Sequence, residues 1–235
     1  MDIVAFGAHP DDVEILAGGL LALSVRQGRD VGIVHMTRGE CATRGNAEER
    51  RQEAFEAARR LGLGPERVMI LDLGDTLLEN SPANRLEVVR ALRQWRPRVV
   101  LHHHPHDRHP DHRKSSVLVA DAFFYAGLHQ IETGQPPHRP SSRLLFFNNT
   151  IPDESPSFVV DVTETFPQKI QALRAYESQL YNPDYPGTET YISSPEYFEQ
   201  IEIRARHFGG LAGVRYGEPY RATSPLLVRN LSAFF

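Results

Sequence analysis

The chain has 235 residues, 40% of them hydrophobic, and a formal net charge of −4 at pH 7. This length and composition predict one domain over residues 1–235 with a core of its own, and the weak negative charge argues against the basic footprint of a nucleic-acid-binding protein. No apolar run reaches the ~18 residues of a membrane span, and the first residues lack the pattern of a signal peptide. We therefore expect a cytoplasmic protein with no membrane or nucleic-acid partner. The single cysteine, Cys41, excludes an internal disulfide and is interpreted as an ordinary small residue.

Short β-branched runs alternate with amphipathic stretches in the first half of the chain. In chain order we expect a strand at 2–8, a helix at 12–27, a strand at 30–36, a helix at 47–61, a strand at 67–73, a helix at 84–95, a strand at 98–103 and a helix from Arg113 to about Ala126. This alternation is typical of right-handed βαβ units. It predicts an α/β fold, a Rossmann-like, mostly parallel sheet with helices on both faces.

The rest of the chain is less regular. Strands are expected at 143–149 and 157–162, and helices at 166–178 and 195–208. Residues 181–195 are rich in Pro, Gly and Ser and are long enough for a lid or a binding loop. We expect the C-terminal third to form a cap on the same domain.

Three polar segments follow strands of the predicted sheet. Residues 9–12 follow the first strand, residues 37–45 follow the second, and the histidine-rich segment 102–112 follows the fourth. Ligand sites of open parallel sheets lie outside the carboxyl ends of the strands. We therefore expect these segments to meet at one edge of the sheet.

Two of these segments supply metal-ligand residue types. His9 and Asp12 are three residues apart at the turn into the first helix, and His112 lies in the third segment. Two imidazoles and one carboxylate form a three-ligand zinc site with a position left for water, which is typical of a catalytic site. The same donors also accept Fe(II), Co(II) or Mn(II), so the identity of the ion stays open.

The remaining residues near this site have more than one interpretation. Asp11 is either a general base that takes a proton from water or the N-cap of the first helix. His109 either binds the metal or, with Asp111 holding one ring nitrogen, acts as a cation that stabilises an oxyanion or protonates a leaving amine. We assign His109 to the second role.

The other histidines are interpreted without a catalytic role. His102 and His103 are expected to continue the strand, and His104 and His106 to lie around the site or in solvent. Ordinary packed or solvated positions are expected for His35, His129, His138 and His207.

Four motifs together resemble one known family. AHPDDVE at 8–14, TRGE at 37–40, a helix carrying Arg50 and Glu53, and HPDH at 109–112 resemble the PIG-L/LmbE-like metal-dependent N-acetylglucosaminyl deacetylases, over about the first 125 residues. DRHPDH, YNPDYPG and the closing YGEPYRATSPLLV look most like the bacterial branch that acts on N-acetylglucosaminyl malate in bacillithiol synthesis.

The resemblance implies roles for individual residues. His9, Asp12 and His112 would hold the metal, Asp11 would be the base, and His109, oriented by Asp111, would assist the oxyanion or the amine. Further implied contacts are Arg50 in the sugar pocket, Arg108 at a malate carboxylate, Glu14 at a sugar hydroxyl, and Tyr185 and Tyr191 in the pocket wall. Surface salt bridges for the two arginines, a helix N-terminal charge for Glu14 and loop packing for the tyrosines are the alternatives.

The expected function is zinc-dependent hydrolysis of the N-acetyl group of an N-acetylglucosamine derivative, with one ion per chain and N-acetylglucosaminyl malate as the substrate. Deacetylation of free N-acetylglucosamine, chitobiose or a glycoside is the alternative, and a non-catalytic histidine-rich metal-binding protein is a further one. A nucleotide-binding oxidoreductase is disfavoured because the first turn lacks G-x-G-x-x-G. The family resemblance also implies a homo-oligomer, either a trimer or a hexamer.

Overall fold

Seven strands and six α-helices form the part of the chain that the computed structural model describes, residues 1–147 and 155–227. The strands are β1 Ile3–Gly7, β2 Val31–His35, β3 Val68–Ile70, β4 Val99–His102, β5 Ser142–Phe146, β6 Phe158–Asp161 and β7 Gly217–Ala222. The helices are α1 Asp12–Arg26, α2 Ala47–Arg60, α3 Pro82–Trp95, α4 Pro110–Tyr125, α5 Phe166–Leu173 and α6 Pro195–Ala212, with a 3-10 turn, η1, at Pro65–Arg67.

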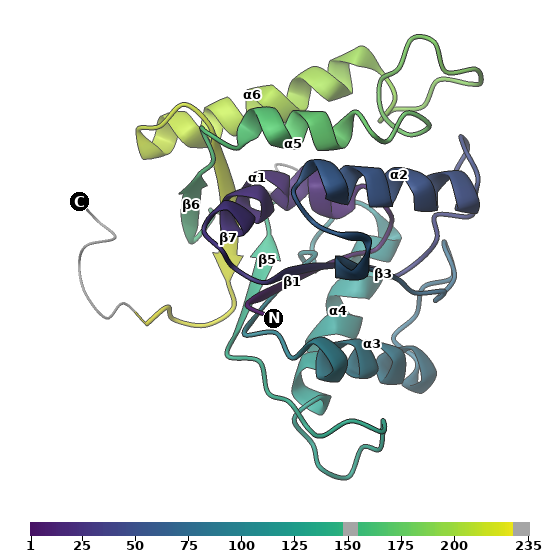
Figure 1. The fold of residues 1–235 in the computed structure, drawn as a ribbon, viewed down its shortest axis with the longest axis vertical. Helices are drawn as coiled ribbons and strands as arrows, with labels where there is room; N and C mark the ends of the chain where they lie inside the picture. The colour runs from purple at the N-terminus through teal and green to yellow at the C-terminus, as the bar shows by residue number, and fades with distance from the viewer. Residues whose placement is uncertain (148–154, 228–235) are drawn as a thin grey trace.

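The strands form a sheet in the order β3-β2-β1-β4-β5-β7-β6 (Figure 1). β1 pairs in parallel with β2 and β4, β2 with β3, and β4 with β5. β7 is antiparallel to both β5 and β6. The prediction of a mostly parallel α/β sheet is therefore confirmed, and the chain reverses direction only at its C-terminal edge.

Helices cover both faces of the sheet, as predicted. In Figure 1, α1, α2, α5 and α6 lie on the upper side and α3 and α4 on the lower side. Alternate residues of β1 point to the two faces because side chains alternate along a strand. Ala5 packs in the core on the α1 side, whereas Val4 and Phe6 pack in the core beneath α3 and α4.

The C-terminal third both caps the sheet and extends it. α5 and α6 lie over the upper layer (Figure 1), while β7 enters the sheet between β5 and β6. No strand was predicted at β7 because Gly217 and Pro219 are poor strand formers. The register explains how Pro219 is tolerated. β7 pairs with β5 only through Tyr220–Ala222, so Pro219 pairs on the β6 side alone.

Several element ends differ from the predicted ones. α4 begins at Pro110 rather than after Arg113, since Pro occupies its first turn and His109 is its N-cap. α6 continues beyond 208 to Ala212 and ends at Gly213, which has a φ of 76°. α5 stops at Leu173 rather than near Ser178. The backbone N–H and the hydroxyl of Ser178 instead donate to Glu53 at 2.6 and 2.7 Å.

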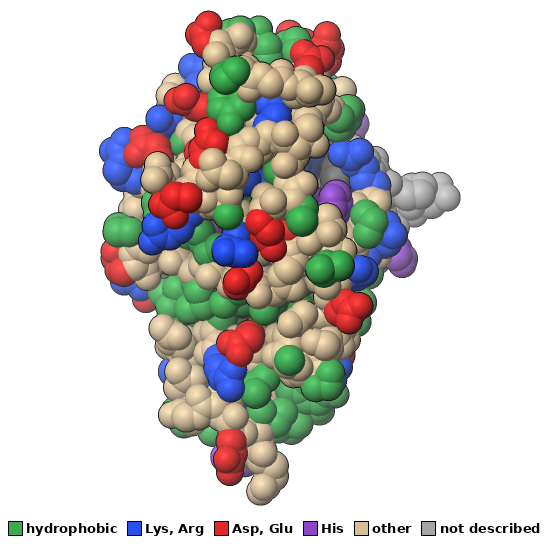
Figure 2. All heavy atoms as spheres, turned by 90° about the vertical axis from the view of Figure 1, so that its right-hand side faces the viewer, with side chains coloured by type: hydrophobic (Ala, Val, Ile, Leu, Met, Phe, Trp, Pro, Cys, Tyr) green, Lys and Arg blue, Asp and Glu red, His purple; other side chains and the backbone are tan. Residues whose placement is uncertain are grey.

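Some predicted positions lie outside the described residues, namely 148 and 149 of the strand expected at 143–149 and the last residue of the closing motif, 228. Among the described helices, none is long and apolar enough to cross a membrane. On the face that Figure 2 shows, side chains of both charges are interspersed, and hydrophobic side chains gather toward its lower half, the half that holds α3 and α4. The single domain over residues 1–235 and the cytoplasmic location stay predictions.

Candidate active site

Loops from the carboxyl ends of four parallel strands meet at one cavity of about 610 Å³. The β1–α1 turn and the loop after β2 are joined directly, since the N–H groups of Met36 and Thr37 donate to the carbonyls of Gly7 and Ala8 at 2.9 and 3.0 Å. The β1–α1 turn supplies His9, the β4–α4 loop supplies His109, the first turn of α4 supplies His112, and the loop after β3 supplies Asp75. The three segments expected to meet do meet, and the loop after β3 joins them.

The β1–α1 turn fixes the two adjacent carboxylates in different directions. Asp12 Oδ2 accepts the backbone N–H of His9 at 2.8 Å, which turns this carboxylate back toward the imidazole. Asp11 has a φ of 117°, an uncommon and strained value for a residue with a Cβ. It occupies the N-cap position of α1, but its side chain makes no capping hydrogen bond. Its Oδ2 instead accepts from Arg50 Nη2 at 3.3 Å.

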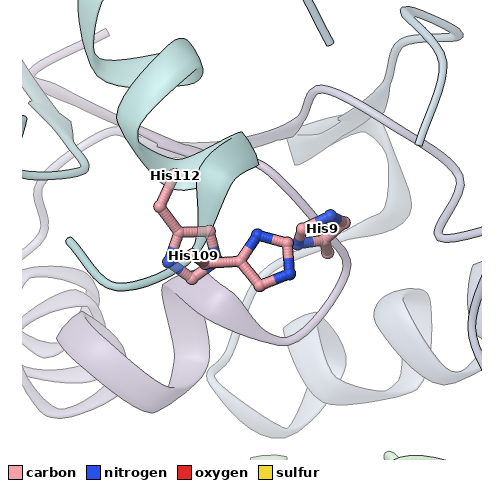
Figure 3. Close-up of side chains that lie close together, drawn as sticks. All are labelled: His9, His109 and His112. Carbon is pink, nitrogen blue, oxygen red and sulfur yellow. The ribbon is translucent and has the colours of Figure 1, made fainter. Parts of the chain in front are cut away.

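The three predicted metal ligands converge. Asp12 Oδ2 lies 3.5 Å from His9 Nδ1, and Asp12 Oδ1 lies 3.1 Å from His112 Nε2. The rings of His9 and His112 are 5.6 Å apart, and the ring of His109 lies within 5.0 Å of both (Figure 3). These nitrogen and oxygen donors, in a partly open cavity, fit zinc or another divalent transition metal.

Ligand-capable atoms cluster in three overlapping sets, in each of which the atoms lie within 4.8 Å of one another. The sets are His9, His109 and His112; Asp12, His103 and His112; and His9, Asp75 and Asp111. The predicted set of His9, Asp12 and His112 is none of these three sets. His9 and His112 belong to the first set and Asp12 to the second, and the Asp12 carboxylate lies within 3.5 Å of a ring nitrogen of each histidine.

Three residues at this site were missed from the sequence. His103 was expected to continue the strand, but β4 ends at His102 and the buried His103 Nε2 lies 3.2 Å from Asp12 Oδ2. Asp107 Oδ1 lies 3.1 Å from His112 Nδ1. Asp75 Oδ1 lies 3.1 Å from His9 Nε2. A signal existed for two of them, since Asp75 follows a strand at the carboxyl edge and Asp107 lies inside the histidine-rich segment.

The expected support of His109 by the Asp111 carboxylate is wrong. Asp111 Oδ2 lies 3.3 Å from His9 Nε2 and accepts the N–H of Thr76 at 2.9 Å. It is the backbone N–H of Asp111 that donates to His109 Nδ1, at 3.2 Å, as part of the helix cap. Burial, followed by the charges of His112 and His9, lowers the pKa of His109. The lowered pKa favours the neutral imidazole over the expected imidazolium, and the N–H of Asp111 at Nδ1 favours the tautomer with its proton on Nε2.

The neighbouring carboxylates differ in their electrostatics. Burial raises the pKa of Asp11 to about 7, against the lowering effect of the Arg50 guanidinium. Burial also opposes ionisation of Asp12, but the adjacent His112 and His103 hold its pKa well below the usual range. Two acidic side chains one residue apart thus have opposite tendencies. Asp12 keeps its negative charge, while Asp11 exchanges a proton near neutral pH.

The residues expected to contact the substrate lie in different surroundings. Arg50, 3% exposed, lines the cavity and is not a surface salt bridge. Arg108 is exposed at the cavity wall, with its Cζ 4.7 Å from the ring centre of Tyr191, which also lines the cavity. Tyr185 donates its hydroxyl to Glu49 at 3.1 Å.

The structure does not support the expected contact of Glu14 with a sugar hydroxyl. Its side chain is fully buried and is not among the residues that line the cavity. It faces the Tyr176 hydroxyl and lies 4.0 Å from His35 Nε2. His35 in turn donates its Nδ1–H to the carbonyl of His9 at 3.2 Å. His35 is therefore a packed core histidine beneath the site, as expected.

Known proteins resemble this chain in sequence and fold. The sequence model of the family described as PIG-L: GlcNAc-PI de-N-acetylase matches residues 4–123. A diacetylchitobiose deacetylase of Thermococcus kodakarensis is 28% identical, over 93% of this chain and 82% of its own length. The conserved protein TT1542 from Thermus thermophilus has a TM-score of 0.87 at 34% identity, with 99% of each chain covered. The N,N'-diacetylchitobiose deacetylase of Pyrococcus horikoshii has a TM-score of 0.79 at 26% identity, covering 94% of this chain and 83% of that one.

These matches confirm the family resemblance that the motifs indicated, but they do not confirm the bacillithiol branch, since two of these relatives are diacetylchitobiose deacetylases. The family match begins at the second residue of β1 and ends within α4, so it contains every loop that brings a histidine or carboxylate to the cavity. The chain therefore belongs to the PIG-L family, and it is an N-acetylglucosaminyl deacetylase of that family.

Proposed function

We propose that the cavity hydrolyses the acetamide of a small N-acetylglucosamine derivative with Asp11 as the general base. The observation that carries this proposal is the position of the Asp11 carboxylate. It is buried beside Asp12, leaves the N-cap of α1 without a side-chain hydrogen bond, and is held by Arg50. A helix-capping residue has no need of that arginine, whereas a base that must point at a water molecule does.

His9, Asp12 and His112 would hold the metal, for which we propose zinc. A bound ion of this kind polarises a carbonyl group and lowers the pKa of a water molecule toward neutrality. Asp75 and Asp111 flank His9 Nε2 and would fix the orientation of its ring, while Asp107 would do the same for His112.

The residues of this chain then have separate tasks. Arg50 holds Asp11 Oδ2, and Asp11 takes a proton from the attacking water. His109 keeps Nε2–H available because its Nδ1 already accepts the N–H of Asp111. It donates a hydrogen bond from Nε2–H to the oxyanion of the tetrahedral intermediate. The proton that Asp11 takes from the attacking water passes to the departing amine as the C–N bond breaks. The products are acetate and a free amine.

For the rest of the substrate we propose N-acetylglucosaminyl malate, a precursor in bacillithiol synthesis. Arg108 supports it, as an exposed cation held on Tyr191 at the cavity wall. Diacetylchitobiose is the second candidate, because the relatives from Thermococcus kodakarensis and Pyrococcus horikoshii are diacetylchitobiose deacetylases.

The role of Asp11 is tested with Asp11→Asn, which retains a side-chain oxygen for Arg50 but cannot accept the proton. We expect metal content by elemental analysis to stay near one ion per chain and amine release to fall by roughly 10²- to 10⁴-fold. Asp72→Asn, at a side chain 65% exposed, is the control and should keep full activity. Unchanged turnover in Asp11→Asn would remove Asp11 from the reaction.

The choice of substrate is tested by kcat/KM on N-acetylglucosaminyl malate, free N-acetylglucosamine and diacetylchitobiose, in wild type and Arg108→Ala. We expect malate to be preferred and the preference to shrink in the variant. A wild-type preference for diacetylchitobiose would replace malate with the second candidate and leave the chemistry of the site in place.

A further inference from the structure

Arg44 is a buried cation in the cavity wall, and its guanidinium has no hydrogen-bonding partner among the residues that the structure describes. It lies between β2 and α2, is 6% exposed and lines the cavity. Its Nε and Nη2 atoms are buried without a hydrogen bond, and no carboxylate in residues 1–147 or 155–227 lies within 4.0 Å of it. Arg50, by contrast, engages Asp11.

The position of Arg44 is unfavourable for the protein alone. A guanidinium stays protonated in proteins, and burying a charge without a partner costs free energy. The ring of Tyr185, with its centre 4.6 Å from Arg44 Cζ, compensates in part. Glu49 is also a neighbour of Tyr185, but its carboxylate accepts a hydrogen bond from the hydroxyl of Tyr185 and none from Arg44. The charge of Arg44 is therefore free to act on a ligand.

The backbone holds Arg44 in place before any ligand binds. Its carbonyl accepts Gln179 Nε2 at 2.6 Å. The next residue, Gly45, has a φ of 73° and packs so closely that an added Cβ would lie 2.7 Å from Ser178 Oγ. The loop after β2 is thus fixed to the segment after α5, so little conformational freedom is lost when Arg44 engages a partner.

We infer that Arg44 is a specificity-determining residue that binds an anionic group, a carboxylate or a phosphate, on the non-acetylated part of the substrate. A guanidinium matches both groups with paired N–H donors. The inference rests on the proposed function, since that function places the sugar acetamide at the histidines and leaves the rest of the cavity to the aglycone. Arg44 and Arg108 come from different loops, so an acidic aglycone would meet two cations. A neutral disaccharide would leave Arg44 without a partner.

The test compares wild type, Arg44→Gln and Arg44→Lys with the matched control Arg51→Gln. Arg51 also stacks on a ring, 4.7 Å from that of Phe55, but it is exposed on α2 and outside the cavity. The substrates are N-acetylglucosaminyl malate, N-acetylglucosamine 1-phosphate and the neutral methyl N-acetylglucosaminide. Thermal melting establishes that each variant is folded.

For Arg44→Gln we expect KM to rise about 10- to 100-fold on one of the anionic substrates with kcat little changed, the loss typical of charge-assisted hydrogen bonds. The neutral substrate should change less than about threefold, and Arg44→Lys should recover part of the affinity because it keeps the charge without the paired donors. Arg51→Gln should match wild type throughout. The anionic substrate that responds identifies the group as carboxylate or phosphate.

An equal loss on neutral and anionic substrates, or no loss on either anionic one, would overturn the role of Arg44. If wild type deacetylates none of the three compounds, it is the proposed function that fails. Arg44 is then judged by calorimetric binding of malate and inorganic phosphate. Binding to wild type and the control, lost in Arg44→Gln, supports the role, and absence of binding to wild type refutes it. Arg44→Lys decides the kinetic test if Arg44→Gln does not fold, because a KM equal to that of wild type on both anions would exclude paired recognition.

Discussion

Glu218 of β7 holds the C-terminal strand to α1 and α5 from inside the protein. Its Oε1 accepts from Lys169 Nζ at 2.6 Å and from the N–H of Gly19 at 2.9 Å. Its Oε2 accepts from the N–H of Leu20 and the hydroxyl of Tyr220, both at 2.8 Å. The side chains of Glu218 and Lys169 are each 3% exposed. Replacing Glu218 with Ala would therefore leave an ammonium group and two N–H groups buried without this acceptor.

Removing one partner of a buried ion pair costs about 3–5 kcal/mol of unfolding free energy. In a chain of this size 1 kcal/mol corresponds to about 2–4 °C in Tm, so Glu218→Ala should lower Tm by about 6–20 °C. Burial already lowers the pKa of Lys169, against the opposing charge of Glu218. Without Glu218 the pKa of Lys169 in the folded state falls further below its value in the unfolded chain. The unfolded chain then binds more protons than the folded one, so the loss of unfolding free energy in Glu218→Ala should shrink as pH rises from 7 toward 10.

Thermal unfolding followed by circular dichroism, at pH 7 and pH 9.5, measures both effects. Glu202→Ala is the control, since Glu202 is 44% exposed and pairs with Arg206 at 2.8 Å, an arrangement worth less than about 1 kcal/mol. The double variant Lys169→Met with Glu218→Leu should recover most of the loss, because no unpaired charge remains. The reasoning is wrong if Glu218→Ala melts no lower than the control, or if the double variant is as unstable as the single one.

Two further predictions concern the metal. Removing it with a chelator should abolish amine release and lower Tm, and added Zn²⁺ should restore both. The Tm responds because an ion bound only to the folded state stabilises that state. Chelated protein that keeps full activity would contradict metal-dependent hydrolysis. Asp75→Asn should weaken Zn²⁺ binding by about 10- to 100-fold, because His9 loses a side chain that orients its ring. Competition with a fluorescent chelator measures this affinity, and Asp72→Asn should leave it unchanged. Equal affinities in the two variants would exclude this role of Asp75.

The sequence alone determined the parallel part of the fold and the location of the site. Hydrophobic periodicity is a local property, so β1 to β5 and the helices between them were predicted close to their observed bounds. The carboxyl ends of parallel strands lie at the same edge of a sheet, and this predicted that His9, Asp12 and His112 lie close together. The motif spacing was sufficient because each motif lies between the carboxyl end of a strand and the first turn of the next helix.

Only the tertiary structure decided which side chains of the site contact each other. Asp111 supports His9 rather than His109, and Asp75 reaches His9 across 66 positions of sequence, because these contacts depend on how whole loops pack. The same holds for β7, whose strand conformation is imposed by pairing with β5 and β6 against weak local propensity. The missing partner of Arg44 is likewise invisible in sequence, since burial and the positions of all surrounding carboxylates are properties of the folded chain.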